Sequence, residues 1–511
     1  MRSRSLIVAL LVTAAPAAAQ EPAPAAPAPA TTPAGRPIRL GEALDVLVRQ
    51  SGALARAEVD VAIADAARTE ASGLDDWRLS ATGAWVSNRR GFIAGTPFQL
   101  TADDSLSVDA GLERSLPSGG TVSVRAGGSY AKNTYAVLDG MGDRFDIDSE
   151  AYQSQVLLSL SHPLLGGAGR RVARVARRRA EAQRTVAELA RAAIAAETVL
   201  DAVRAYWELA YAERALAIQR SSLALAREQL RITRSAIEGK AAAPTEALAV
   251  EQAIAVREQA ILLAEIDITE RSLTLRRTVG LDIGPGDIEL QAADALTLSQ
   301  RTLELDALLA AARAGNPRLA LARQNAEVAA IELTVAADLI RPRLDLSGRV
   351  GPVGAAGNAS DALEQMGTLD GYTAGATLTY GQTLGNRSAR GAHRRVQETV
   401  RKAKVDVAEL ERETAVAVVR AVNLVRSAKK RVEVSEVAIK LAEQNLASEK
   451  VLFQAGDTRA FDVLERQEEL SAARLSRERA MVDYQVALAN LDTVTGALLR
   501  RLGIAILPAK R

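Results

Sequence analysis

Residues 76–83 read DWRLSATG and residues 341–348 read RPRLDLSG, and the segments that precede them also correspond. With residues 40–83 laid against residues 305–348, the matched positions are Leu40 and Leu305, Leu54 and Leu319, Leu79 and Leu344, and Gly83 and Gly348. Each copy continues from a helical pattern through alternating strands into a very long helix, a turn and a return helix. The chain is therefore an internal duplication.

The composition favours long helices and gives no support to catalysis. Hydrophobic residues make up 48% of the chain and charged residues 25%, which is typical of bundled helices. The net charge of +2 gives no electrostatic reason to expect a nucleic-acid partner. There is no cysteine, and the two histidines, His162 and His393, are too few for a metal cluster. No catalytic motif is present, so we expect a protein that is not an enzyme and has no cofactor and no metal site.

The N-terminus has the pattern of an export signal. Arg2 and Arg4 precede an apolar run, and Ala17 to Ala19 supply small residues for cleavage, so residues 1–19 are predicted to be a signal peptide. Residues 20–37 are rich in Pro and Ala and are predicted to be an extended leader. No later run of about 18 apolar residues follows. Any entry into a membrane would therefore require a β-barrel.

The strand segments alternate between apolar and polar residues. Leu79, Ala81, Gly83 and Trp85 alternate with polar neighbours, and about ten of the sixteen aromatic residues lie in or beside such segments. Aromatic residues in this position are typical of the girdles of membrane barrels, and a soluble hairpin domain is the alternative.

The first copy has an additional stretch, residues 105–130, with a turn signal at Pro117 to Gly120. It predicts either an added hairpin, which gives four strands in the first copy and two in the second, or an elongated loop that leaves four membrane strands per chain. Six strands are too few for a barrel from one chain, so closure would need several chains.

Two proline-free rods, residues 169–238 and 387–455, carry the length of the molecule. A helix of about 70 residues is roughly 105 Å long. Gly239 and Gly456 are predicted left-handed caps that end the rods. The return helices, 244–279 and 459–495, and the opening helices, 40–76 and 305–341, are half as long, so two of them stacked end to end match one rod.

The sequence resembles the TolC family of outer-membrane efflux channels along essentially the whole mature chain. The carrying segments are GNPRLALARQNAEVAAIELTVAADLIRPRLDLSG (315–348), SHPLLGGAGRR (161–171), FQAGDTRAFDVLERQ (453–467) and LDTVTG (491–496). The resemblance implies a mixed fold of a transmembrane β-barrel and a long α-helical barrel, which is completed by a homotrimer. It implies a location in the outer membrane, in contact with its lipid. The partners would be a periplasmic adaptor and an inner-membrane pump.

Each rod and its return helix meet at a turn, which we call the tip. The resemblance also implies a gate at the second tip, after Gly456. Asp462 and Glu465 match family positions that form acidic rings, which would favour cations. The alternative is that they merely complement the helix dipole. Arg459 would join a latch near Gly456, although it lies one residue further along than its family counterpart, and Phe453 stands where some members have tyrosine. The first tip, after Gly239, has no acidic pair and is the predicted adaptor-docking hairpin.

Both copies place a basic cluster just after the strands. Arg170, Arg171 and Arg174 lie in the first copy, and Arg394 and Arg395 in the second. This basic collar is predicted to be either a solvated helix face or a contact with anionic lipid or the tunnel lumen.

The expected boundaries are a first repeat at 38–281 with strands at about 78–163, a linker at 282–302, a second repeat at 303–503 with strands at about 343–383, and a tail at 504–511. The main functional prediction is a passive channel of an efflux or type I secretion system. A periplasmic adaptor or structural coiled-coil protein is the alternative.

Overall fold

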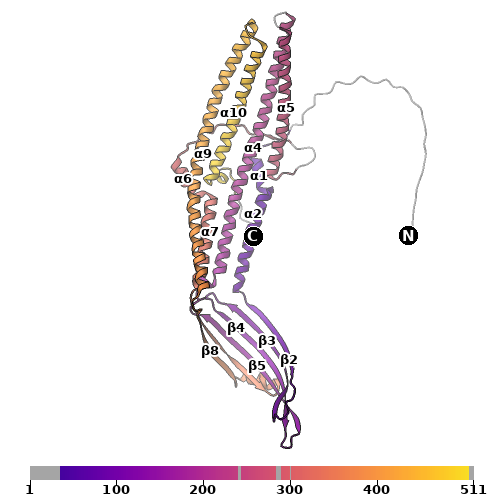
Figure 1. Ribbon diagram of the computed structural model, residues 1–511, viewed down its shortest axis with the longest axis vertical. Helices are drawn as coiled ribbons and strands as arrows, with labels where there is room; N and C mark the ends of the chain where they lie inside the picture. The colour runs from indigo at the N-terminus through magenta and orange to yellow at the C-terminus, as the bar shows by residue number, and fades with distance from the viewer. Residues whose placement is uncertain (1–34, 240–242, 283–288, 300, 506–511) are drawn as a thin grey trace, which may run out of the picture.

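The computed structural model describes residues 35–239, 243–282, 289–299 and 301–505. The molecule is elongated, with a bundle of helices at one end and a β-sheet at the other (Figure 1). The predicted signal peptide and nearly all of the predicted leader lie outside the described residues. Most of the predicted tail, 504–511, does so as well.

The duplication is preserved in the positions of the elements. The two opening helices and the first sheet strand of the second copy begin 265 residues after those of the first. The matched pairs are α1 (Leu40–Gln50) with α6 (Leu305–Gly315), α2 (Gly52–Ser72) with α7 (Pro317–Asp338), and β2 (Arg78–Arg89) with β7 (Arg343–Ala356).

The prediction of a single opening helix in each copy is wrong, because each is broken after its eleventh residue. In the second copy Asn316 is extended, with ψ 118°, as expected for a residue before proline. Its Oδ1 accepts hydrogen bonds from the backbone N–H groups of Arg318 at 2.9 Å and Leu319 at 3.1 Å, so it caps α7. In the first copy the break falls at Ser51, before Gly52.

The sheet contains six antiparallel strands in the order β2-β3-β4-β5-β7-β8. The first copy contributes four strands and the second contributes two, so the prediction of an added hairpin is confirmed. Residues 105–130 lie within that hairpin. Among the described residues, neither edge strand, β2 nor β8, pairs with a further strand, so the sheet of one chain is open. The remaining bounds are η1 (Gly73–Asp75), β3 (Phe98–Ser115), β4 (Thr121–Leu138), β5 (Arg144–Pro163), α8 (Ala359–Thr368) and β8 (Tyr372–Gly381).

Two rods run the length of the helical part. They are α4 (Val175–Glu238), which follows the short α3 (Arg170–Ala173), and α9 (Arg387–Ala455). The return helices are α5 (Pro244–Val279) and α10 (Ala460–Val494). Rod α4 packs on α2 and α5, and rod α9 packs on α7 and α10 (Figure 1). Two shorter helices therefore lie one after the other along each rod, as predicted. No described helix combines the length and apolar composition needed to cross a membrane.

A small domain packs against the middle of the bundle. Strand β1 (Arg36–Ile38) pairs in parallel with β6 (Leu290–Ala292). The end of the predicted leader and the predicted linker therefore both contribute strands. The hydroxyl of Tyr206 on α4 donates to Asp294 Oδ2 at 2.7 Å and accepts from the Asp294 backbone N–H at 3.1 Å. This domain, with α11 (Leu498–Arg501), packs over the largest apolar core, which includes Leu47, Val199, Tyr206 and Leu275.

Candidate functional site

The two rods end in different turns. Gly456 has φ 83°, and the Asp457 N–H bonds the Leu452 carbonyl at 3.0 Å, which is a left-handed cap as predicted. Gly239 has φ −76°, so the prediction of a left-handed cap there is wrong. Its N–H bonds the Ser235 carbonyl at 3.1 Å, which continues the helical pattern. The glycine in the first tip is therefore not required by its backbone angle.

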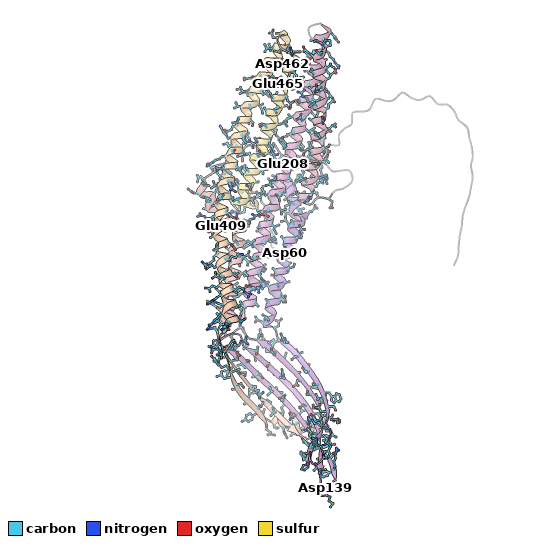
Figure 2. The ribbon with its side chains drawn as sticks, in the orientation of Figure 1. Asp60, Asp139, Glu208, Glu409, Asp462 and Glu465 are labelled. Carbon is cyan, nitrogen blue, oxygen red and sulfur yellow. The ribbon has the colours of Figure 1, made fainter. Side chains whose placement is uncertain are left out.

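The acidic pair lies at the start of α10, at the end of the molecule far from the sheet (Figure 2). Helix α10 is capped at Arg459, rather than at Asp457 or Thr458. Asp462 Oδ2 accepts the Arg459 N–H at 3.0 Å, so this carboxylate caps the helix. Glu465 is exposed and lies 3.6 Å from Arg466 Nη2. One oxygen of Asp462 is thus engaged locally, whereas Glu465 faces solvent in the single chain.

The two tips are joined through α5 and α10. Glu246 Oε2, in the first turn of α5, accepts the Ala460 N–H at 3.3 Å, and Ala460 is fully buried. Phe453 packs against two apolar clusters. One, which includes Val250 and Leu464, connects the two hairpins, and the other lies within the second hairpin. The Arg459 side chain is exposed and forms no inter-helix hydrogen bond among the described residues. Glu246, which follows Pro244 and Thr245 at the start of the helix, was not among the predicted site residues.

The two faces of the sheet differ in chemistry. One row of register partners is apolar across all six strands, and the next row is mostly polar. The apolar row is Leu79, Leu112, Val124, Leu158, Val350 and Ala374; the polar row is Arg78, Glu113, Ser123, Ser159, Arg349 and Gly375.

Exposure and curvature distinguish the same two faces. On the apolar face Leu79 and Trp85 are each 72% exposed. The polar face is hollowed by a cavity of about 670 Å³ whose lining includes Asp109, Gln155 and Arg349. A largely exposed apolar face on one side and a concave polar face on the other are the pattern of a membrane barrel wall.

Aromatic side chains mark two levels on the apolar face. Trp85, Tyr130 and Tyr152 belong to one row of register partners, and the rings of Tyr130 and Tyr152 lie 4.8 Å apart. Nearer the helices, Trp77 and Tyr380 are 55% and 59% exposed. Eight residues separate Trp77 from Trp85, about 26 Å along a strand before tilt. This separation is comparable with the apolar band of about 25 Å on membrane barrels.

Helix α8 lies on the apolar face, towards the end of the sheet that is far from the helices. Ser154 Oγ donates to the Ala362 carbonyl at 2.7 Å. Gly354 provides the close approach, since a Cβ there would lie 1.8 Å from the Ala362 oxygen. Leu363 and Leu369 remain 56% and 65% exposed.

The basic collar divides between the region of α3 and the start of α4 in the first copy and the start of α9 in the second. Arg170, Arg171 and Arg174 come together with Arg178 and Thr334 around an open hollow of about 430 Å³. Arg394 and Arg395 are exposed on α9 and do not line this hollow. Figure 2 shows nitrogen-bearing side chains gathered at the end of the helices that meets the sheet. In the first copy these arginines line a pocket, whereas in the second copy they are exposed on α9.

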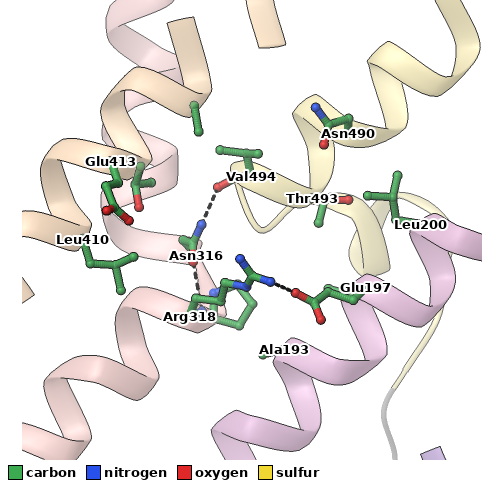
Figure 3. Close-up of a pocket in the computed structure, with 14 residues that line it drawn as sticks. Ala193, Glu197, Leu200, Asn316, Arg318, Leu410, Glu413, Asn490, Thr493 and Val494 are labelled. Carbon is green, nitrogen blue, oxygen red and sulfur yellow. Dashed lines mark hydrogen bonds and ion pairs between the residues drawn. The ribbon is translucent and has the colours of Figure 1, made fainter. Parts of the chain in front are cut away.

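A second cavity, of about 290 Å³, lies where α6 and α7 meet α4, α9 and α10 (Figure 3). Asn316 Nδ2 donates to the Val494 carbonyl at 2.9 Å, and Arg318 forms an ion pair with Glu197. The same asparagine that caps α7 thus ties it to the end of α10. Within the described residues no group of three His, Cys, Asp or Glu side chains could hold a metal ion.

A carboxyl group in the middle domain has a perturbed pKa. Burial raises the pKa of Glu213 to about 7, although the Ala292 N–H and the charge of Arg214 act in the opposite direction. Its Oε1 accepts the Ala292 N–H at 2.9 Å, so the side chain anchors β6 to α4. This contact was not predicted, because the two residues are far apart in the sequence.

Comparison with known proteins supports the fold over most of the chain. No protein-family model matches the sequence, and no curated protein matches it. The outer-membrane channel OprN has a TM-score of 0.65 at 14% identity, over 90% of each chain. The CmeC outer-membrane channel of Campylobacter jejuni has a TM-score of 0.63 at 12% identity, over 90% of this chain and 86% of its own. VceC, an outer-membrane protein of Vibrio cholerae, has a TM-score of 0.62 at 15% identity, over 89% of this chain and 96% of its own.

The chain therefore has the fold of outer-membrane channels. The predicted resemblance to the TolC family is confirmed at the level of the fold.

Proposed function

We propose that this protein is an outer-membrane channel that conducts solutes passively along a tunnel of helices. The observation that carries the proposal is the chemical difference between the two faces of the sheet. An apolar face with leucine and tryptophan side chains more than two-thirds exposed is unfavourable in water and favourable in lipid. The concave polar face would line a water-filled lumen.

Closure requires further copies of the chain. The sheet has free edges at β2 and β8 among the described residues, and open edges are not tolerated in the hydrocarbon region. Three copies joined edge to edge would give eighteen strands, an even number within the range of known barrels. The names of the structural neighbours as outer-membrane proteins support the location. We therefore propose a homotrimer that spans the outer membrane and projects its helices into the periplasm.

We further propose that the helical tips carry the gate and dock the partners. Glu465 is exposed at the second tip, and Asp462 lies one turn before it. In a trimer they would form two neighbouring acidic rings that favour cations. A periplasmic adaptor and an inner-membrane pump would meet the tips and supply the energy. Efflux of small molecules and export of proteins both fit this scheme.

Conductance measurements test the channel and its gate together. The purified protein is inserted into planar bilayers, and single-channel conductance and reversal potential are recorded for wild type and for the double variant D462A/E465A. We expect cation-selective channels whose selectivity falls in the variant. The control E409A/E411A removes the same charge far from the tips (Figure 2) and should behave as wild type. Absence of channels would refute the proposed function; unchanged selectivity in D462A/E465A would refute only the rings.

Fractionation separates the channel from the alternative function. A periplasmic adaptor or structural coiled-coil protein would be recovered as a soluble periplasmic protein. The proposed channel should be recovered from outer membranes as a heat-sensitive trimer.

A further inference from the structure

The pocket at the start of α4 is lined almost entirely by arginine. Arg170 and Arg171 come from α3, Arg174 and Arg178 from the beginning of α4, and Thr334 from α7. No carboxylate lines the hollow of about 430 Å³. Four guanidinium groups around one space repel one another unless an anion lies between them.

Ion pairing within the chain does not account for these arginines. Among the described residues, Arg170, Arg171 and Arg178 form no ion pair, and Arg174 reaches Asp75 only at 3.5 Å. The Nε of Arg174 is buried without a hydrogen-bond partner. A buried donor left unsatisfied is costly, which favours a missing acceptor at this place.

Most other arginines of α4 form ion pairs. Every arginine of α4 from residue 204 onwards pairs with a carboxylate: Arg204, Arg214, Arg220, Arg227, Arg231 and Arg234. Arg177, Arg179 and Arg184, which do not line the hollow, also pair with carboxylates. Apart from Arg191, whose Nε is buried without a partner, the arginines of α3 and α4 that form no ion pair among the described residues are therefore ones that line the hollow. A generally solvated basic face would not produce this contrast.

The position of the pocket at a helix start adds to the argument. Helix α4 is 64 residues long and has no acidic residue in its first turn. The positive end of its dipole faces the same region as the arginines, which is unfavourable for cations and favourable for an anion. Several guanidinium groups together are well suited to a phosphate group.

The pocket also lies at the level of the headgroups, if the sheet spans the membrane as proposed. Asp75, which pairs with Arg174, precedes the exposed Trp77 by two residues. Trp77 marks the boundary of the apolar face that is nearer the helices. Aromatic girdles lie at the headgroup level, where phospholipids carry their phosphate groups.

We propose that Arg170, Arg171, Arg174 and Arg178 form a binding site for a phosphate group, of the kind that a phospholipid headgroup presents on the periplasmic side of the outer membrane. The lipid as the source of that phosphate rests on the proposed function. The pocket itself rests on the arrangement of four arginines, three of which form no ion pair among the described residues. Thr334 adds a hydroxyl donor, and Arg174 supplies the buried Nε–H.

Binding to the purified, delipidated protein tests the site. Titrations with short-chain phosphatidylglycerol, with short-chain phosphatidylcholine and with inorganic phosphate are followed by native mass spectrometry and calorimetry. The test variant is R170Q/R171Q/R178Q, which spares the ion pair of Arg174. The control variant, R204Q/R220Q/R227Q, removes the same charge from the same helix at exposed ion pairs, which contribute little to stability.

We expect wild type and control to bind phosphatidylglycerol and the test variant to bind it at least about tenfold more weakly, a loss of about 1.4 kcal/mol or more. Preference for the anionic lipid over inorganic phosphate identifies a headgroup as the source; equal affinity for inorganic phosphate identifies free phosphate. Equal binding by wild type and test variant, or no binding by wild type, overturns the proposal. Planar-bilayer conductance of the same preparations is scored separately, so a protein that conducts but binds no phosphate refutes the pocket alone, and one that binds but does not conduct refutes the channel.

Discussion

Replacement of Glu213 by glutamine should remove a pH dependence from the stability of the helical domain. Burial raises the pKa of this carboxyl from an ordinary value of 4.5 to about 7. A raised pKa means that the folded state favours the protonated form. The contribution of Glu213 to the free energy of unfolding is therefore complete below pH 4.5 and is lost as the pH rises through about 7.

The size of the effect follows from the pKa shift. Each pKa unit corresponds to about 1.4 kcal/mol, so the full shift would be worth roughly 3 kcal/mol. Because Glu213 is only partly buried, solvent screening reduces this to about 2 kcal/mol per chain. The glutamine oxygen can still accept the Ala292 N–H, so E213Q should match wild type at pH 5. At pH 8 it should melt about 2–4 °C higher than wild type.

The assay is thermal unfolding of the detergent-solubilised protein, followed by circular dichroism at 222 nm between pH 5 and pH 8 at one scan rate. E238Q, which changes an exposed glutamate at the end of α4, serves as the control and should follow wild type. Wild-type stability that does not change over this range, or an equal loss in E213Q, would refute the assignment.

Three further predictions concern the helix ends and the sheet. G456A should lower the free energy of unfolding by about 1 kcal/mol because φ is 83° at that residue, whereas G239A, at φ −76°, should leave it almost unchanged. The unfolding midpoints of the two variants are compared with that of wild type. N316A should lower the free energy of unfolding by about 1–2 kcal/mol through loss of the α7 cap. The control N358A, at the exposed cap of α8, should leave the melting temperature of the long helices unchanged. G354V should displace α8 and make residues 359–368 sensitive to protease, whereas G357V, with open space around its Cα, should not; equal cleavage of both would contradict the packing.

Local pattern was enough to predict the repeated part of the fold. The duplication set the order of elements, and proline-free stretches ending at glycine set the lengths of α4 and α9. The break at Asn316 follows from the next residue being proline, a signal that was present in the sequence. The difference between Gly239 and Gly456 was not, because either glycine can adopt both conformations and the turn that follows selects one.

Contacts between distant segments account for what was missed. The pairing of β1 with β6 joins residues about 250 positions apart through two strands of three residues, too short for a periodic pattern. Glu213 meets the Ala292 N–H only when β6 packs beside α4, and burial in the folded chain raises its pKa. The arginines of the collar were visible as residues, but Thr334 belongs to the same pocket only because α7 ends beside the start of α4.

The most direct test of the central claim is whether lipid covers the apolar face of the sheet. The chain contains three tryptophans: Trp77 and Trp85 are exposed beside and on the sheet, and Trp207 is buried among the helices. The protein is reconstituted into vesicles whose acyl chains carry bromine, which quenches tryptophan fluorescence on contact. We expect strong quenching in wild type and almost none in W77F/W85F, which retains only Trp207. Unquenched wild-type fluorescence in vesicles that hold the protein would contradict the account.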